Sequence, residues 1–327
     1  MHYLKKIISI LGFCLPLASE AAIYPLTPTT DIVGQVQLTA TKYEDSFITL
    51  AAKYDIGFDE LVQANPYIDP WVPGEGAVVV IPTRYVLPPR AERRGIIINL
   101  AELRLYYFPA DGRSVHTYPI GIGRMAEMED VNWKTPLGKL SIIQKQEIAN
   151  WVVPASIKRE AELEGRTMPD FIPPGADNPM GKHKLRLSNP TYLIHGTNKE
   201  VGIGRRVSHG CINMFNADVE QLFNVVPVGT QVNIVHQPYK VGWKDGYLWL
   251  EAHQPLDDYR DAGDYSVDAL MAVTQHATQN LPANVDWTLT KQFYASNLGL
   301  PMVVGKIGAN NQLVTFNLEE SANSAVF

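Results

Sequence analysis

The segment 192–214 of the chain reads YLIHGTNKEVGIGRRVSHGCINM. Its first residues predict an apolar strand that ends at His195 and runs into a turn at Gly196. Cys211 follows sixteen residues after His195. A catalytic thiol needs a base, donors for the oxyanion of a tetrahedral intermediate, and a group that orients the base. Since this segment can supply all three, we interpret Cys211 as a candidate nucleophile, although the common role of a lone cysteine is to pack in a core.

Two histidines are expected close to the thiol. His195, held at a strand end and oriented by a backbone carbonyl, is the candidate base. His209 is expected to shape the turn and its local field. Gly210 lets backbone N–H groups approach a substrate carbonyl, whereas the helix expected over 217–223 begins too late to provide them. We therefore assign the oxyanion donors to the turn formed by Gly210 and Cys211.

The sequence upstream of this segment is rich in branched and aromatic residues. Runs of this composition, separated by turn signals, predict strands over 96–100, 104–108, 116–122 and 139–145. Strands in series indicate a mainly β domain, built as a sandwich or a barrel. Residues 147–181 form a long insertion with one helical piece and a proline-rich stretch, which we interpret as a lid over the site.

The HGT and SHGCIN motifs, together with the Asp218 that follows them, resemble the L,D-transpeptidase catalytic domain of the YkuD type. The resemblance covers residues 94–237. It implies a mainly β sandwich in which Cys211 is the acylated nucleophile and His195 the proton donor and acceptor. His209 and Gly210 complete the expected catalytic motif, and the expected substrate contacts are Gly196, Ser208, Asn213 and Arg206.

The arginines before the motif have two interpretations. Arg205 and Arg206 could meet a substrate carboxylate, because a guanidinium matches that group with two hydrogen bonds. Two exposed arginines that only solvate a loop are an equal alternative. Some members of the family carry arginine where this chain has Asn213, which leaves the assignment intact and affects only the substrate contacts at that position.

The resemblance also implies a reaction. Cys211 would attack the carbonyl before the terminal D-alanine of a peptidoglycan tetrapeptide, release D-alanine and hold the stem as a thioester. An amine would then accept the stem, either from diaminopimelate, giving a 3→3 cross-link, or from the terminal lysine of an outer-membrane lipoprotein. A hydrolase of the L,D-carboxypeptidase or amidase type, with water as acceptor, would use the same residues. A non-catalytic wall-binding protein is a third interpretation, which the intact Cys211 and His195 disfavour.

Residues 41–83 predict a small separate module. One helical face is expected over 47–54, a second helix ends before Asn65-Pro66, and a strand covers 78–81. The stretch LVQANP at 61–66 and the closing strand resemble a LysM domain, a family that binds N-acetylglucosamine-containing glycans such as peptidoglycan. A packing domain without a sugar site is the alternative.

Residues 238–327 form a C-terminal extension in which we find no chemistry. A strand is expected over 247–250, helices around 267–274 and 289–294, and β-like segments at 302–304 and 313–316. We expect this extension to be a packing appendage, with no role assigned to it.

The N-terminus predicts export. Lys5 and Lys6 precede an apolar run of twelve residues, and small residues before Ala22 fit a cleavage site, so residues 1–21 are interpreted as a signal peptide. A retained anchor is the alternative, although the run is shorter than the ~20 residues that span a bilayer. With the LysM-like module, the arrangement is similar to periplasmic L,D-transpeptidases of Gram-negative bacteria.

Charge and residue spacing exclude other classes of function. Lys and Arg number 28 against 34 Asp and Glu, a formal charge of −6, which argues against nucleic acid as a partner. Three further histidines lack paired ligand spacing: His183, His236 and His253. No metal or other cofactor is therefore expected.

Overall fold

The computed structural model describes residues 22–125, 133–147, 150–279 and 283–308. The predicted signal peptide, residues 1–21, and the β-like segment 313–316 lie outside these residues. Within the described residues, no helix is long and apolar enough to span a bilayer.

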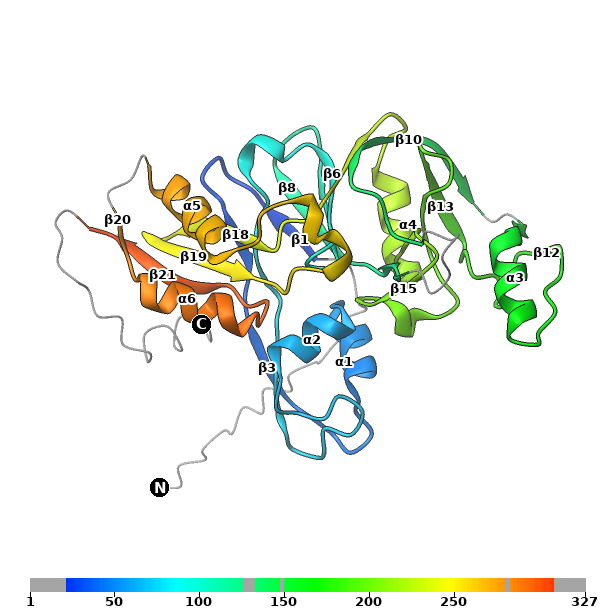
Figure 1. The fold of residues 1–327 in the computed structure, drawn as a ribbon, viewed down its shortest axis with the longest axis horizontal. Helices are drawn as coiled ribbons and strands as arrows, with labels where there is room; N and C mark the ends of the chain where they lie inside the picture. Colours follow the sequence, from blue (N-terminus) through cyan, green and yellow to red (C-terminus); the bar gives the residue numbers. More distant parts are fainter. Residues whose placement is uncertain (1–21, 126–132, 148–149, 280–282, 309–327) are drawn as a thin grey trace, which may run out of the picture.

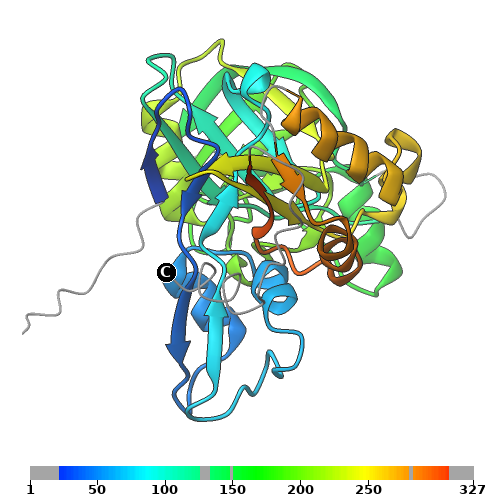
Figure 2. The same ribbon diagram turned by 90° about the vertical axis from the view of Figure 1, so that its left-hand side faces the viewer.

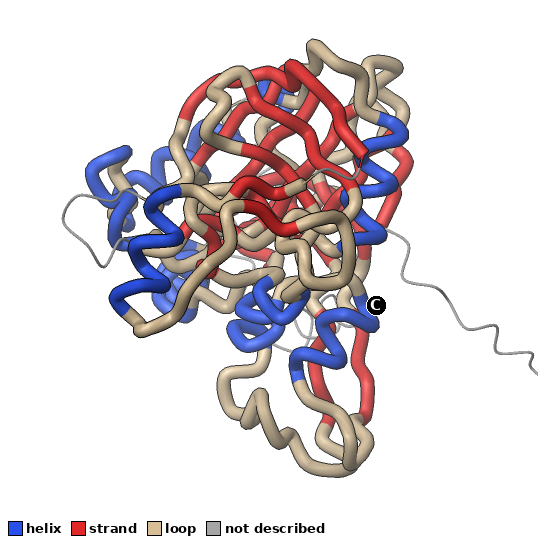
Figure 3. Tube along the Cα trace, turned by 90° about the vertical axis from the view of Figure 1, so that its right-hand side faces the viewer, coloured by secondary structure: helices blue, strands red, loops and turns tan. Residues whose placement is uncertain are grey.

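The largest element is a curled nine-stranded sheet (Figure 3). Its strands, in spatial order, are β1 (Ala22–Pro25), β8 (Ser114–Pro119), β7 (Arg104–Phe108), β6 (Gly95–Asn99), β17 (Gln231–Val235), β10 (Gly138–Glu147), β13 (His183–Leu187), β14 (Leu193–His195) and β16 (Ile212–Asn213). Two pairs are parallel, β6 with β17 and β14 with β16, and the other pairs are antiparallel. The mainly β prediction is confirmed.

Both faces of this sheet are covered, which explains why its strands read as continuous apolar runs. Successive residues of β6 point to opposite faces: Ile96 and Ile98 join one core, and Ile97 joins the other. Helix α4 (Asn216–Val225) packs on the first face. The pair β2 (Ile32–Gly34) and β5 (Arg84–Val86) contributes to the second.

Residues 37–81, which include most of the predicted module, lie in a compact unit beneath the sheet (Figure 1). Strand β3 (Gln37–Ala40) pairs with β4 (Val78–Ile81), and helices α1 (Phe47–Tyr54) and α2 (Phe58–Ala64) lie between them in sequence. Figure 2 shows the blue and cyan strands of this module running down from the sheet. Helix α1 begins at a capping box formed by Ser46 and Thr49.

Buried contacts connect this module to the nine-stranded sheet and to the residues that precede β15. Glu60 of α2 forms an ion pair of 2.5 Å with Arg104 of β7, and both side chains are buried. The backbone N–H groups of Phe58 and Asp59 donate to the carbonyls of Ile203 and Gly204. The module therefore packs against β7 and against residues 203–204, which precede Arg205.

The segment between β10 and β13 contains a short hairpin and a helix. Strands β11 (Trp151–Val152) and β12 (Phe171–Ile172) pair, and α3 (Ala155–Leu163) lies between them. Strands β9 (Ile122–Gly123) and β15 (Arg206–Ser208) form a second short pair beside the site. Short 3-10 turns occur at η1 (Arg90–Glu92) and η2 (Glu200–Gly202).

The C-terminal extension builds a second sheet, which lies at the opposite end of the molecule from α3 (Figure 1). Its strands are β18 (Tyr239–Lys244), β19 (Tyr247–Ala252), β21 (Met302–Ile307) and β20 (Ala283–Val285), in that order. Helices α5 (Val267–Thr278) and α6 (Trp287–Ser296) contribute to its core. The chain between β19 and α5 contains the 3-10 helix η3 (Asp257–Ala262).

Replacing Glu60 with Gln should lower the free energy of unfolding by about 3 kcal/mol, because it leaves the Arg104 guanidinium buried without its counter-charge. Urea denaturation measures this loss. The matched control is Glu164→Gln, which breaks an ion pair with Arg166 whose side chains are 52% and 59% exposed. That variant should lose less than about 0.5 kcal/mol. Equal losses in the two variants would contradict a stabilising role for the buried pair.

Candidate active site

Two short strands bring the predicted nucleophile and base together. Strand β14 ends at His195, and β16 begins directly after Cys211. The strands are parallel, with Ile194 beside Ile212 and His195 beside Asn213. The Cys211 sulfur lies near Thr191, which directly precedes Tyr192 and β14. The pairing thus brings His195 close to the residues that directly follow Cys211.

His195 is buried and its ring has a fixed orientation. Its Nδ1 lies 2.6 Å from the carbonyl oxygen of Gly196. Because a carbonyl only accepts, Nδ1 carries the proton and donates it, which leaves the lone pair on Nε2. Burial, with a smaller contribution from the nearby Lys184, lowers the pKa of His195 to about 4. The imidazole is therefore neutral at neutral pH and can act as a base.

The Cys211 thiol is also neutral in the resting site. The residue is half-buried, and its sulfur lies 3.9 Å from the carbonyl oxygen of Thr191. Burial raises the pKa of Cys211 above the ordinary 9.0, although the backbone of Leu193 partly opposes this shift. The two pKa shifts together favour a neutral thiol and a neutral imidazole over a preformed thiolate–imidazolium pair.

The turn before Cys211 requires glycine. Gly210 has a φ of +103°, and a Cβ at this position would lie 3.0 Å from the ring of Tyr192. Its N–H donates to the Ser208 hydroxyl at 3.2 Å, and that hydroxyl donates to the Cys211 carbonyl at 2.6 Å. Ser208, expected to contact substrate, thus bonds within the turn, and the Gly210 N–H, expected as an oxyanion donor, already has an acceptor. Of the two oxyanion donors expected from the sequence, Gly210 N–H and Cys211 N–H, the Cys211 N–H therefore remains the candidate.

His209 is bound to the predicted lid. Its Nε2 lies 2.7 Å from Glu160 of α3, and its ring packs edge-on against Trp133. Burial raises the pKa of Glu160, but the hydrogen bonds from His209 and Arg124 outweigh this effect and lower it. No pattern in the sequence indicated this hydrogen bond, which links α3 to the SHGCIN motif.

The other predicted site residues occupy structural positions. Arg206 forms an ion pair of 2.6 Å with Asp258 of the extension, so its charge is already neutralised. A Cβ at Gly196 would lie 2.3 Å from the side chain of Asn216, which explains the glycine. The backbone of Asn213 forms a bridge with Gly121, and its side-chain Oδ1 is buried with no hydrogen-bond partner among the described residues.

Arg205 faces the module rather than open solvent. Its guanidinium lies over the ring of Phe58 in α2, 5.1 Å from the ring centroid. The pKa of Asp59 is raised by burial, and Arg205 partly opposes that shift. Arg205 is partly exposed and packs against the module, and its role in substrate binding stays a prediction.

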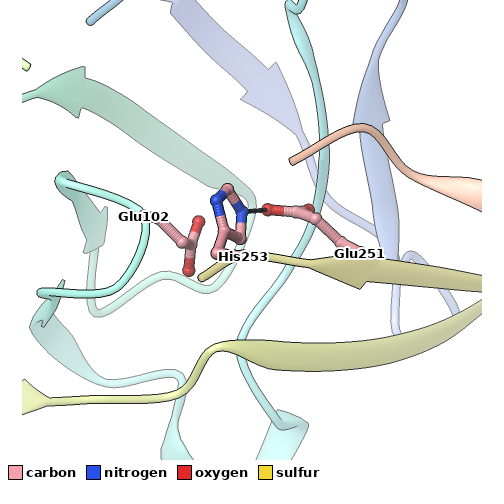
Figure 4. A group of neighbouring side chains, drawn as sticks. All are labelled: Glu102, Glu251 and His253. Carbon is pink, nitrogen blue, oxygen red and sulfur yellow. Dashed lines mark hydrogen bonds and ion pairs between the residues drawn. The ribbon is translucent and has the colours of Figure 1, made fainter. Parts of the chain in front are cut away.

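One buried cluster has the composition of a metal site. Glu102, Glu251 and His253 gather between the catalytic sheet and the extension (Figure 4), with one potential ligand atom of each within 4.8 Å of the others. Lys240 Nζ lies 2.7 Å from Glu102 and 3.1 Å from Glu251. A protein cation thus lies between the carboxylates, and the cluster is a buried ion network rather than a fitting site for a metal.

Comparisons with known proteins agree on one family. The model of the L,D-transpeptidase catalytic domain, YkuD, matches residues 93–234. An Escherichia coli K12 protein named "Probable L,D-transpeptidase ErfK/SrfK" is 38% identical over 273 residues, which are 81% of this chain and 85% of that protein. A second, "Probable L,D-transpeptidase YcfS", is 41% identical over 252 residues, 76% of this chain and 77% of that protein. An L,D-transpeptidase structure from Xylanimonas cellulosilytica matches with a TM-score of 0.35 at 18% identity, covering 54% of this chain and 77% of that chain.

Alkylation of Cys211 by iodoacetamide should be slow at neutral pH and should still be rising above about pH 9, because the thiolate is the reactive form and burial raises the thiol pKa. Intact-mass kinetics between about pH 5 and 10 measure this profile, with Cys211→Ala as the background. A plateau near neutral pH, as a preformed thiolate would give, contradicts the neutral resting pair.

Proposed function

Because this chain belongs to the YkuD family of L,D-transpeptidases, we propose that it is a cysteine-dependent transpeptidase acting on peptidoglycan tetrapeptide stems. The observation that carries the proposal is the neighbouring placement of Cys211 and His195, with His195 Nδ1 bonded to Gly196. That bond directs the basic nitrogen of the ring away from the backbone. A structural cysteine has no need of such an oriented base.

The chemistry follows from the neutral resting pair. Nε2 of His195 takes the thiol proton as the sulfur attacks the carbonyl before the terminal D-alanine. The imidazolium so formed is acidic, since the folded protein holds the pKa of His195 at about 4. It readily returns the proton to the departing amine, which leaves as D-alanine, while the stem stays on sulfur as a thioester.

The second half of the reaction uses the same groups in reverse. An acceptor amine loses a proton to His195 and attacks the thioester carbonyl, and Cys211 leaves and regains its proton. We propose an amine as the acceptor, from diaminopimelate of another stem or from the terminal lysine of an outer-membrane lipoprotein. Water in its place would make the protein an L,D-carboxypeptidase or amidase, an outcome that product analysis distinguishes.

We also propose that the enzyme is exported to the periplasm and that residues 41–83 bind glycan. Support for export comes from the predicted signal peptide. Support for glycan binding comes from two aromatic side chains of the module that protrude into solvent, Tyr43 at 86% and Tyr67 at 99% exposure. Exposed aromatic rings of this kind offer apolar faces for a sugar ring.

The Cys211→Ala variant should release no D-alanine from a disaccharide tetrapeptide and form no acyl-enzyme, because the covalent path needs the sulfur. Mass spectrometry of muropeptides after incubation with the purified protein identifies the products and the acceptor. His195→Ala should slow acylation on the order of 10² to 10⁴-fold. Continued D-alanine release by Cys211→Ala would disprove the mechanism, and an unchanged rate in His195→Ala would assign the base to another residue.

Binding by the module is best tested without deleting it, since Glu60 neutralises the buried Arg104. Replacing Tyr43 and Tyr67 together with Ala should weaken retention on insoluble peptidoglycan about tenfold and leave turnover of a soluble tetrapeptide unchanged. The double Phe variant keeps both rings and serves as the matched control. Equal retention of the Ala variant and the native protein in a sedimentation assay would remove the glycan-binding role.

A further inference from the structure

A residue of the C-terminal extension is buried in the core of the catalytic domain. Tyr259, in η3, is fully buried and belongs to the cluster that includes Ile194 and Ile212 of the catalytic strands. Its ring stacks on His236, with the centroids 5.3 Å apart. The other apolar residues of the extension mostly form a core of their own. Leu256 packs at the edge of the same core, and Tyr259 is the member of the extension that is fully buried within it.

The hydroxyl of Tyr259 is connected to the Gly210–Cys211 turn through Thr135. It donates to the carbonyl oxygen of Thr135 at 2.6 Å. Thr135 is itself fully buried, and its hydroxyl donates to the carbonyl oxygen of Gly210 at 2.9 Å while accepting from the Gly123 N–H at 2.9 Å. One residue therefore separates the extension from the peptide that precedes Cys211.

Asp258, which precedes Tyr259, contacts the strand that leads into the turn. Asp258 accepts a hydrogen bond of 2.6 Å from Arg206 of β15, and Arg206 also donates to the carbonyl of Gly123. The ammonium of Lys134 donates to the backbone carbonyl of Asp258. Asp258 thus contacts Arg206, just before the turn, and residues 258 and 259 both contact the segment 134–135 that packs against the turn.

These contacts fix the orientation of the peptide group between Gly210 and Cys211. The Gly210 carbonyl and the Cys211 N–H belong to the same planar trans unit and point in opposite directions. The Thr135 hydroxyl, by binding that carbonyl, fixes the direction of the Cys211 N–H. This N–H is the donor that the turn retains for an oxyanion, since the Gly210 N–H is bound to Ser208. An oxyanion donor helps only when its direction is fixed before the reaction.

We propose that Tyr259 is a positioning residue for acyl transfer, which acts through Thr135 to aim the Cys211 N–H at the developing oxyanion. The proposal rests on the proposed function and assigns to the extension a role in the active site itself. It distinguishes two reactions of the same sulfur. Attack on a carbonyl builds an oxyanion and needs the aimed N–H, whereas alkylation by iodoacetamide builds none.

The experiment compares those two reactions in the full-length protein. The probes are p-nitrophenyl acetate, whose p-nitrophenolate release reports acylation, and iodoacetamide, followed by intact mass, with Cys211→Ala as the background for both. The quantity of interest is the ratio of the acylation rate to the alkylation rate. In Tyr259→Phe, which keeps the buried ring, this ratio should fall about tenfold.

Three further variants make the result specific. Thr135→Val should lower the ratio by about 10² because it removes the hydroxyl that holds the peptide, and Thr135→Ser should restore it to within about threefold of the native value. Tyr107→Phe is the matched control, since its hydroxyl also donates to a backbone carbonyl, that of Val225 at 3.2 Å, and its ring lies in the same core. Its ratio should equal that of the native protein.

A ratio in Tyr259→Phe that stays within about twofold of the native value, or falls no more than in Tyr107→Phe, overturns the proposal. Equal slowing of both probes overturns it as well, because that result reports a change in the thiol. If Tyr259→Phe fails to fold, the comparison of Thr135→Val with Thr135→Ser decides, and equal ratios there refute the role. Turnover of the tetrapeptide by the native protein is measured separately, so failure of the proposed function is recognised independently.

Discussion

The candidate active site depends on the pairing of two very short parallel strands. Strand β14 has three residues and β16 has two, and together they place His195 beside the residues that follow Cys211. So few ladder hydrogen bonds cannot fix side-chain directions to the precision that acyl transfer needs. Neighbouring groups supply the remaining constraints, because Ser208 and Thr135 bond to the backbone of the turn and the Gly196 carbonyl orients the imidazole.

Buried groups carry no charge at the candidate site, whereas buried ion pairs occur where separate parts of the chain meet. Burial disfavours charge on both His195 and Cys211, so the resting pair carries none. Fully buried charges occur instead where parts of the chain meet, at Glu60 with Arg104 and at Lys240 between two glutamates. Separating the two partners would leave an unpaired buried ion, which is costly in free energy. These pairs therefore favour one arrangement of the parts.

The interface between the module and the catalytic domain also holds two acidic side chains. Burial and the neighbouring Asp55 raise the pKa of Asp218 well above 3.8, so the pair retains a proton that isolated carboxyls would lose. Asp218 lies in the first turn of α4, which packs on the core beneath the catalytic strands. Buried polar contacts therefore connect the N-terminal module to the large sheet, and that sheet to the C-terminal extension.

The sequence alone determined the local features, because they follow from residue type and spacing. The apolar runs of β6 and β7, the helices of the module, and the HGT and SHGCIN motifs were all readable from it, and so was the family. Only the tertiary structure decided which groups the motif residues contact. It placed Arg206 against Asp258, His209 against Glu160 and the Gly210 carbonyl against Thr135. These partners lie between 49 and 75 residues away along the chain, and no local pattern encodes a contact that forms only when separate segments pack together.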